Sequence, residues 1–386
     1  MLLARDISAT LESLRQYYPI VYLGGPRQAG KTTLLRHFYP NLPYANLEDP
    51  ELRLLAEQDP RRFLGRFPAG AILDEAQRVP TLFSYLQVLV DEDRSRQFLL
   101  SGSQNFLLME RITQSLAGRV GILNLLPFSY AELQATAFKP ATLNNFVWRG
   151  GYPALYDRET PQAVFFGNYL QTYLERDVRL LKNIGDLGLF SRFVRLCAGR
   201  VGQPLNMTTL AADLGISVNT VKSWFSILEA SYMIFYVQPF YENFNKRIIK
   251  SPKYYFYDSG LLCYLLGISD VAQLDLHHYY GNIVENALIA DLYKKRTNAG
   301  LRPVFWFWQD QQGNEVDLLI EENGRLMAIE IKSSQTFNTR LLTGLKRWEQ
   351  VKGALPSESY LVYAGTQEMA LENCRLLPWE AALQGL

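Results

Sequence analysis

The chain has 386 residues, a net charge of +1 and 48% hydrophobic residues. This length supplies two or three domains with buried cores, and the composition is that of a folded globular protein. The balanced charge excludes a polyelectrolyte that attracts nucleic acid through its overall field, so any nucleic-acid binding must come from local patches.

Cysteine and histidine usage argues against a metal cluster built from these residues. The three cysteines Cys197, Cys263 and Cys374 are far apart, and the chain has only three histidines. We expect free thiols in a reducing cytoplasm. The N-terminal residues 1–6 lack the pattern of a signal peptide, and no apolar stretch is long enough for a membrane span. The expected location is therefore cytoplasmic, with no membrane partner.

The most informative motif follows the apolar run Ile20–Leu23 and precedes a helical pattern. It reads G-x-x-x-x-G-K-T from Gly25 to Thr32, and its strand–loop–helix context predicts a phosphate-binding loop rather than an ordinary turn. Lys31 is expected to reach the β- and γ-phosphates of ATP, and Thr32 to bind Mg²⁺. The predicted nucleotide-binding residues are Gly25, Pro26, Arg27, Gln28, Ala29, Gly30, Lys31, Thr32 and Thr33.

A second motif supports the first. The run Ala71–Leu73 is typical of a buried strand and ends in Asp74 and Glu75. Asp74 is the expected partner of the Thr32-bound Mg²⁺, and Glu75 is placed to orient or deprotonate an attacking water. We therefore predict a metal site from Thr32 and Asp74, with Glu75 as a catalytic residue.

Residues up to about 135 alternate apolar runs with helical patterns, which is typical of a mostly parallel sheet covered by helices. The fourth run, Gln97–Ser101, leads into a polar cluster at a carboxyl end of the sheet, where ligands collect. Ser103 or Gln104 is a candidate sensor of the γ-phosphate. An ordinary turn explains the same cluster.

The middle of the chain is mainly helical. Residues 209–221 match a helix-turn-helix, with Gly215 at the turn and Ser217 as the cap of the second helix. The outer face of that helix is polar but barely basic, so both a nucleic-acid contact and a structural winged helix fit. The run Lys246–Lys253 is more basic and suits either phosphate contact or a solvated strand edge.

The C-terminal segment predicts an α/β domain with a hairpin. Strands flank Asn323-Gly324, the strongest signal for a two-residue turn. That register sets Asp317 opposite Glu330 and Glu315 opposite Lys332, all on one face. Opposed carboxylates repel, so a divalent cation bound by Asp317 and Glu330, with Lys332 beside it, is one interpretation. A solvated charged face with a Glu315–Lys332 pair is the other, and a bulge would break the argument.

Glu285 lies on an apolar helix stripe and is a candidate fourth member of this site. It also fits the third position of a helix cap that begins at Asn282. The sequence alone leaves both roles open.

These motifs together resemble a large bacterial and archaeal family of AAA-type ATPases with an uncharacterised C-terminal domain. The resemblance is carried by 25–33, 73–77, 100–103, 115–119, 150–153, 173–177 and 252–256. It implies that the C-terminal domain is similar to the PD-(D/E)XK nuclease fold, with its motif on Asp317, Glu330 and Lys332 and with Glu285 as the helix carboxylate. It also implies a sensor role for Ser103 and an arginine sensor or finger role for Arg119.

The predicted fold class is α/β. The predicted domains are a P-loop AAA-type ATPase over 1–138, a helical winged-helix domain over 139–275 and a restriction-endonuclease-like domain over 276–386. The predicted function is an ATPase coupled to a metal-dependent nuclease. An NTP-gated switch that binds DNA or protein without cleavage and an ATP-driven protein-remodelling scaffold are the alternatives. ATP, Mg²⁺ or Mn²⁺, nucleic acid (DNA in preference to RNA) and a homo-oligomeric partner are the expected ligands and partners.

Overall fold

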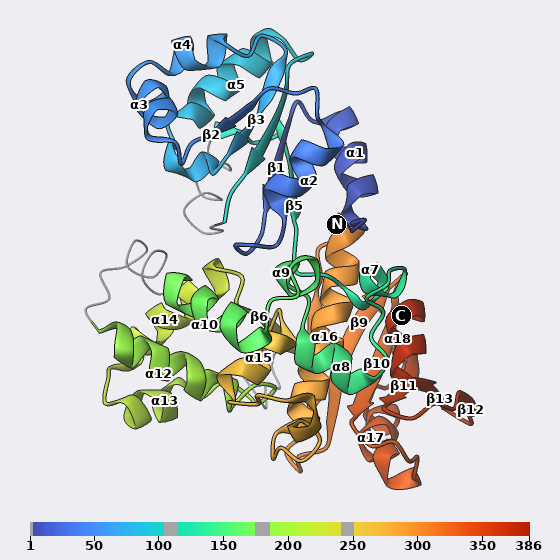
Figure 1. The fold of residues 1–386 in the computed structure, drawn as a ribbon. Helices are drawn as coiled ribbons and strands as arrows, with labels where there is room; N and C mark the ends of the chain where they lie inside the picture. The colour runs from blue at the N-terminus through green and yellow to red at the C-terminus, as the bar shows by residue number, and fades with distance from the viewer. Residues whose placement is uncertain (1–2, 104–114, 174–185, 241–250) are drawn as a thin grey trace. The chain divides into compact units, whose positions relative to one another are not determined.

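The computed structural model describes residues 3–103, 115–173, 186–240 and 251–386 (Figure 1). They form two compact units. The first comprises 1–128, 230–232 and 294–301, and the second comprises 129–229, 233–293 and 302–386. The predicted division into three domains remains a prediction.

The first unit is built on a five-stranded parallel sheet with the order β2-β3-β4-β1-β5. Its strands are β1 (Ile20–Gly24), β2 (Tyr44–Asn46), β3 (Gly70–Asp74), β4 (Gln97–Ser101) and β5 (Val120–Asn124). The five apolar runs of the sequence thus become the five strands, which confirms the predicted parallel sheet.

Helices cover both faces of this sheet (Figure 1). They are α1 (Ile7–Tyr17), α2 (Lys31–Phe38), α3 (Pro50–Gln58), α4 (Pro60–Gly65) and α5 (Leu82–Glu92). Alternate residues of each strand point to opposite faces. Val21 and Leu23 pack with α1 and α2, whereas Ile20 and Tyr22 pack with α3, α4 and α5. Burial on both faces explains why the strands read as continuous apolar runs.

The first half of the second unit is helical. Its helices are α7 (Tyr130–Gln134), α8 (Leu143–Arg149), α9 (Ala154–Asp157), α10 (Gln162–Tyr173), α12 (Leu187–Ala198), α13 (Met207–Leu214) and α14 (Val218–Ala230). Helices α13 and α14 form the predicted helix-turn-helix: Gly215 has a φ of +68°, and Ser217 Oγ accepts a hydrogen bond from the Thr220 amide. Val221, Trp224 and Leu228 are buried, as their helical spacing predicts.

An eight-stranded mixed sheet forms the rest of this unit, in the order β12-β13-β11-β10-β9-β8-β6-β7. Its strands are β6 (Ile234–Pro239), β7 (Lys253–Phe256), β8 (Phe305–Gln309), β9 (Glu315–Glu322), β10 (Arg325–Lys332), β11 (Ser357–Tyr363), β12 (Met369–Leu371) and β13 (Cys374–Pro378). Strands β6 and β7 come from the predicted middle domain, yet they extend this C-terminal sheet through parallel pairing of β6 with β8.

Four helices accompany the sheet in the sequence: α15 (Ser259–Leu265), α16 (Tyr280–Asn298), α17 (Thr343–Val351) and α18 (Trp379–Gly385). Helix α17 packs directly on β9, because a Cβ added to Gly344 would lie 1.8 Å from the Glu315 carbonyl oxygen. Trp348 of α17 lies in the core with Leu319, Leu345 and Leu361.

The hairpin turn has the predicted form. Asn323 and Gly324 both have positive φ, at +51° and +76°, as a type I′ turn requires. The ladder from Glu322↔Arg325 to Leu318↔Ile329 keeps the predicted register. On the other edge of β9, the pairing with β8 shifts by one residue between Trp306 and Trp308. The ladder ends there, so the predicted pairs Asp317–Glu330 and Glu315–Lys332 lie outside it.

The α17 core sets the stability of this sheet. Trp348 is 2% exposed and makes edge-to-face contacts with Phe240 and Trp308. Trp348→Ala should lower the free energy of unfolding by about 3–5 kcal/mol, because it removes buried area and leaves a cavity. Urea unfolding followed by circular dichroism measures this loss. The exposed neighbour Lys346→Ala should change it by less than about 0.5 kcal/mol. Equal losses in both variants would contradict the packing argument.

Candidate functional site

The phosphate-binding loop lies between β1 and α2 in the first unit. Gly25 has a φ of +138°, and a Cβ there would lie 2.1 Å from the Leu125 carbonyl oxygen. Gly30, at +96°, precedes the first residue of α2. Both positions therefore require glycine, and the loop leads straight into the positive end of a helix.

Lys31 is held inside the loop. Its ammonium donates hydrogen bonds to the carbonyl oxygens of Gly25 at 2.9 Å and Pro26 at 2.8 Å. The side chain is buried, so the ammonium group is held in place beside the loop backbone. A fixed ammonium in a glycine loop that leads into a helix N-terminus is an arrangement that binds phosphate.

Asp74 lies at the carboxyl end of β3 and meets Thr32 as predicted. One carboxylate oxygen accepts hydrogen bonds from Thr32 Oγ1 at 2.7 Å and from the Tyr44 hydroxyl at 2.8 Å. The other accepts one from Ser101 Oγ. Burial, then the hydrogen bond to Asp74, raises the pKa of Tyr44, so its hydroxyl stays a donor. Sequence analysis missed Tyr44, the first residue of β2, and Ser101, the last residue of β4; both strands lie beside β3.

Glu75 follows Asp74 with a left-handed φ of +55°. This conformation is uncommon for a residue with a side chain and often occurs at functional sites. The Gln77 amide donates to its carboxylate, and Ser103 Oγ lies 3.5 Å from the same oxygen. The structure thus brings the candidate sensor Ser103 to the candidate water-positioning residue. Gln104 lies outside the described residues.

Arg119 is not brought to this site. It directly precedes β5, at the amino end of the parallel sheet, whereas the phosphate loop follows the carboxyl end of β1. Its guanidinium forms a two-point ion pair with Asp91, at 2.6 and 2.8 Å. The predicted role of Arg119 as an arginine sensor in its own chain is therefore wrong, and its role as an arginine finger stays a prediction.

A cluster of ionisable residues lies in the second unit, around β9 and β10. Lys332 Nζ is 2.6 Å from Glu330 and 3.7 Å from Asp317. Asp317 also accepts a hydrogen bond from the Ile331 amide at 2.7 Å. The three residues of the predicted metal motif therefore meet, although the ladder ends one residue before them.

Glu285 joins the cluster from α16. Its carboxylate and those of Glu315 and Asp317 each offer an oxygen within 4.8 Å of the others. Helix α16 begins at Tyr280, so Asn282 is its third residue and donates instead to the Val201 carbonyl. The cap interpretation of Glu285 is therefore wrong, and the geometry favours its role in the cluster.

The structure adds Lys253, which sequence analysis assigned to an exposed basic run. Its side chain is 2% exposed, and its ammonium pairs with Glu315 and lies 3.7 Å from Glu285. The predicted Glu315–Lys332 pair and the phosphate contact of Lys253 are therefore both wrong. Residues 246–250 of that run lie outside the described residues. Alternation along β7 also brings Tyr255 to Glu285, with a hydrogen bond of 2.6 Å.

Burial raises the pKa values of Glu285, Glu315 and Glu330. Burial, opposed by the Lys253 charge and reinforced by Asp317, raises the pKa of Glu285 to about 7. Burial and the charge of Asp317 hold the pKa of Glu330 well above its usual value. Burial alone would lower the pKa of Lys253, but the charges of Glu285, Glu315 and Asp317 raise it. The surrounding carboxylates thus hold Lys253 in its ammonium form, whereas burial disfavours ionisation of Glu285 and Glu330.

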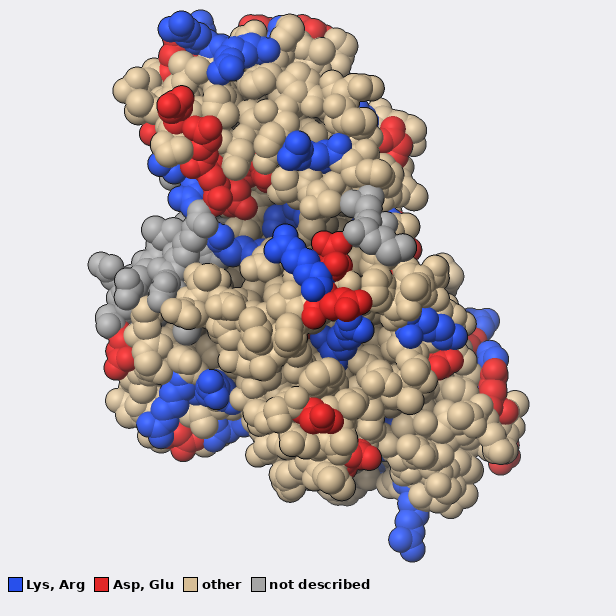
Figure 2. Space-filling view, in the orientation of Figure 1, with Lys and Arg blue, Asp and Glu red and all other residues tan. Residues whose placement is uncertain are grey.

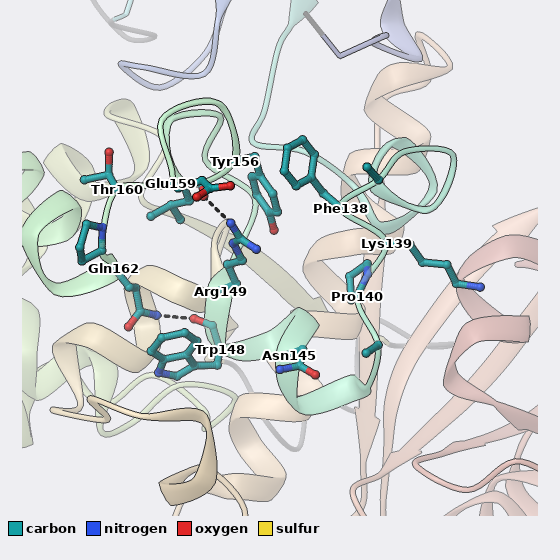
Figure 3. Close-up of a pocket in the computed structure, with 14 residues that line it drawn as sticks. Phe138, Lys139, Pro140, Asn145, Trp148, Arg149, Tyr156, Glu159, Thr160 and Gln162 are labelled. Atoms are coloured by element: carbon teal, nitrogen blue, oxygen red, sulfur yellow. Dashed lines mark hydrogen bonds between the residues drawn. The ribbon is translucent and has the colours of Figure 1, made fainter. Parts of the chain in front are cut away.

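A separate cavity of about 450 Å³ lies in the second unit (Figure 3). Trp148, Asn145 and Phe138 line it, while Lys139 points away from the other labelled side chains. Arg149 donates to the Leu155 carbonyl at 2.6 Å and lies over the Tyr156 ring. Of the fourteen lining residues only Glu159 is acidic, so the cavity has no carboxylate pair for a metal.

Family models divide the chain into three matches. An AAA domain matches 17–134, and domains of unknown function, DUF8612 and DUF4143, match 140–272 and 280–382. The AAA match covers the phosphate loop, Asp74 and Glu75. Together with the parallel sheet, it identifies the first unit as a P-loop, AAA-type domain.

Two curated relatives match most of the chain. The uncharacterized proteins Mb2031c of Mycobacterium bovis and Rv2008c of Mycobacterium tuberculosis are each 33% identical over 339 residues, which is 86% of this chain and 74% of theirs. The chain belongs to the family of these proteins. Among solved structures, the Walker-type ATPase PABY2304 of Pyrococcus abyssi is 17% identical, with a TM-score of 0.44, covering 67% of this chain and 94% of its own.

Within the part of the chain that the structure describes, no helix has the length and apolar character needed to cross a bilayer.

The buried ammonium in the loop carries the first prediction for the nucleotide site. Lys31→Ala should weaken ATP binding about 10- to 100-fold, because a charge-assisted hydrogen bond contributes about 1.5–3 kcal/mol. Fluorescence titration with a labelled ATP analogue measures the affinity. Lys346→Ala, which removes an exposed lysine of the other unit, should leave it unchanged. Wild-type affinity in Lys31→Ala would exclude this loop as the nucleotide site.

Glu75 carries the second prediction for this site. Glu75→Gln should keep ATP bound but lower turnover by about 100-fold or more, because the amide cannot take a proton from water. Nucleotide affinity and phosphate release are measured side by side. Glu48→Gln, a nearby acid that pairs with Arg78, is the matched control and should hydrolyse ATP normally. Normal turnover in Glu75→Gln would assign the role to another residue.

Proposed function

We propose that the chain is an AAA-type ATPase in which the nucleotide state controls a metal-dependent, PD-(D/E)XK nuclease-like domain that acts on nucleic acid. The observation that carries this proposal is the meeting of Asp317, Glu330 and Lys332 beside Glu285. Two acidic residues and a lysine at one position are the groups that a metal-dependent nuclease uses.

The residues fit a divalent cation. Asp317 and Glu330 are each 5% exposed, and Glu330 Oε2 is buried without a hydrogen-bond partner. A hard cation with oxygen ligands would satisfy that oxygen. We therefore propose that Asp317 and Glu330 hold Mg²⁺ or Mn²⁺. The ion would act as a Lewis acid on a phosphate oxygen. Lys332 would stabilise developing negative charge, and Glu285 would add a further carboxylate beside the metal ion.

The helices of the second unit support nucleic acid as the substrate. We interpret α12, α13 and α14 with the hairpin β6–β7 as a winged helix. In a helix-turn-helix of this kind, the second helix, here α14, binds duplex DNA. Asn219, Lys222 and Ser226 are exposed on α14. Figure 2 shows a group of Lys and Arg side chains over the region of α12 and α13, and α12 carries the exposed Arg192 and Arg195. Such a local patch supplies the charge that the whole chain lacks.

A second candidate function is an NTP-gated switch whose C-terminal domain binds without cleavage. The observation that favours it is Lys253, whose ammonium already contacts the carboxylates of Glu285 and Glu315. In this case ATP would select among arrangements of the protein, and the acidic cluster would be a structural ion-pair network.

Glu330 provides the test that separates the two functions. With Mg²⁺ or Mn²⁺, the wild type should cut single-stranded DNA, duplex DNA or RNA, and duplex DNA is expected to be cut fastest. Glu330→Gln should lower the rate about 100-fold or more, because it removes a ligand charge next to the cation. Gel electrophoresis of labelled substrates, with and without ATP, measures cleavage and its coupling to the nucleotide.

The matched control is Glu321→Gln, an exposed acid on the neighbouring strand β9, which should cut like the wild type. Intact ATP hydrolysis without cleavage of any substrate would overturn the nuclease and favour the switch. Equal cleavage by Glu330→Gln and the wild type would assign the activity to another site or to a contaminant.

A further inference from the structure

The acidic cluster contains an ammonium group that comes from outside the predicted metal motif. Lys253 is the first residue of β7, on the hairpin that follows α14. Its Nζ pairs with Glu315, lies 3.7 Å from Glu285 and lies 5.1 Å from the centre of the Phe307 ring. The group is therefore enclosed by two carboxylates and an aromatic face, with its side chain 2% exposed.

This ammonium lies at the oxygens best placed for a metal ion. Glu285, Glu315 and Asp317 offer three oxygens within 4.8 Å of one another, and Lys253 contacts the first two residues. A metal ion bound by that trio would have to share the space with a buried positive charge, and like charges in a buried site repel strongly.

The other half of the cluster contains a buried oxygen that a cation would satisfy. Glu330 Oε2 has no hydrogen-bond partner although it is buried, whereas Glu330 Oε1 is 2.6 Å from Lys332. Lys332 pairs with Glu330 and lies near Asp317, whereas Lys253 pairs with Glu315 and lies near Glu285. The cluster as a whole has four carboxylates and two ammonium groups. When all are ionised, two negative charges remain, and one divalent cation neutralises them.

We infer that Lys253 is a built-in cation that restricts the acidic cluster to a single divalent metal ion, held by Asp317 and Glu330. Lys253 fills the Glu285–Glu315 half and takes the place of a second metal ion. This inference rests on the proposed function, because it needs the metal site at Asp317 and Glu330. It goes further because it sets the number of bound metal ions at one. It also assigns the exclusion of a second ion to Lys253, a residue of the β6–β7 hairpin.

Metal stoichiometry tests the inference. Mn²⁺ is titrated into the nucleotide-free full-length protein, and free Mn²⁺ is measured by electron paramagnetic resonance. Asp317→Asn gives the number of ions bound elsewhere, including the phosphate loop. The wild type should bind one Mn²⁺ more than Asp317→Asn. Lys253→Met, which keeps an unbranched side chain one atom shorter and removes its charge, should bind one more than the wild type. Lys253→Arg keeps the charge and should match the wild type.

The outcomes separate the inference from the function on which it rests. If the wild type binds no more Mn²⁺ than Asp317→Asn, the proposed metal site is absent and the inference falls with it. If the wild type exceeds Asp317→Asn but Lys253→Met equals the wild type, only the inference is overturned.

Lys253→Met leaves the carboxylates of Glu285 and Glu315 without their cation, which can prevent the variant from folding. A second variant therefore accompanies it. Lys253→Gln, which keeps an N–H donor, replaces it in the titration if Lys253→Met does not fold. The melting temperature gives a second measurement, since a variant with two sites gains more from Mn²⁺ than a protein with one. A gain no larger than that of the wild type in either variant would overturn the inference.

Discussion

Buried carboxylates need hydrogen bonds or positive charges beside them, and this requirement organises both candidate sites. A carboxylate removed from water is costly unless it is hydrogen-bonded or paired. Asp74 is compensated by the hydroxyl groups of Thr32, Tyr44 and Ser101. These donors carry no charge, so they bring no positive charge to the site. The cluster around Asp317 is instead compensated by two ammonium groups. The same physical demand is thus met in two different ways.

The irregular part of β9 is what brings the second cluster together. The β9–β10 ladder ends at Leu318, and the pairing of β9 with β8 shifts by one residue in the same region. Asp317 therefore accepts a hydrogen bond from the Ile331 amide rather than facing Glu330 across a regular pair. Bulges re-aim side chains and are common next to active sites. In this sheet, the irregularity lets β7 and α16 place Lys253 and Glu285 against the same carboxylates.

Local patterns predicted the parallel sheet, the helix-turn-helix and the hairpin turn correctly, because each depends on residues close together in the sequence. The apolar runs became strands, Gly215 and Ser217 formed the turn and cap, and Asn323-Gly324 formed a type I′ turn. The convergence of Asp317, Glu330 and Lys332 was also predictable, because the hairpin register set them near one another. The predicted domains and the roles of the site residues still await experiment.

The errors arose where contacts join distant parts of the chain. Lys253 was taken for a solvated residue because its neighbours in the sequence are basic, and nothing local shows that β7 joins the C-terminal sheet. Arg119 was assigned to the nucleotide by resemblance, but its place before β5 puts it at the opposite edge of the sheet from the phosphate loop. The Glu285 cap failed because α16 begins two residues earlier than Asn282. The surroundings of these residues depend on contacts between distant parts of the chain, which local sequence propensity does not predict.

The way the chain divides between its two units has a consequence for how the protein is made. The nucleotide-binding unit includes residues 230–232 and 294–301, far downstream of its sheet. In it, Tyr232 donates a hydrogen bond to Asn124, and the Asn298 carbonyl accepts one from Thr10. A ribosome that has released only the first 128 residues has therefore not yet delivered every part of this unit. Its folding can be completed only after most of the second unit has also been synthesised, which ties the two halves together during biogenesis.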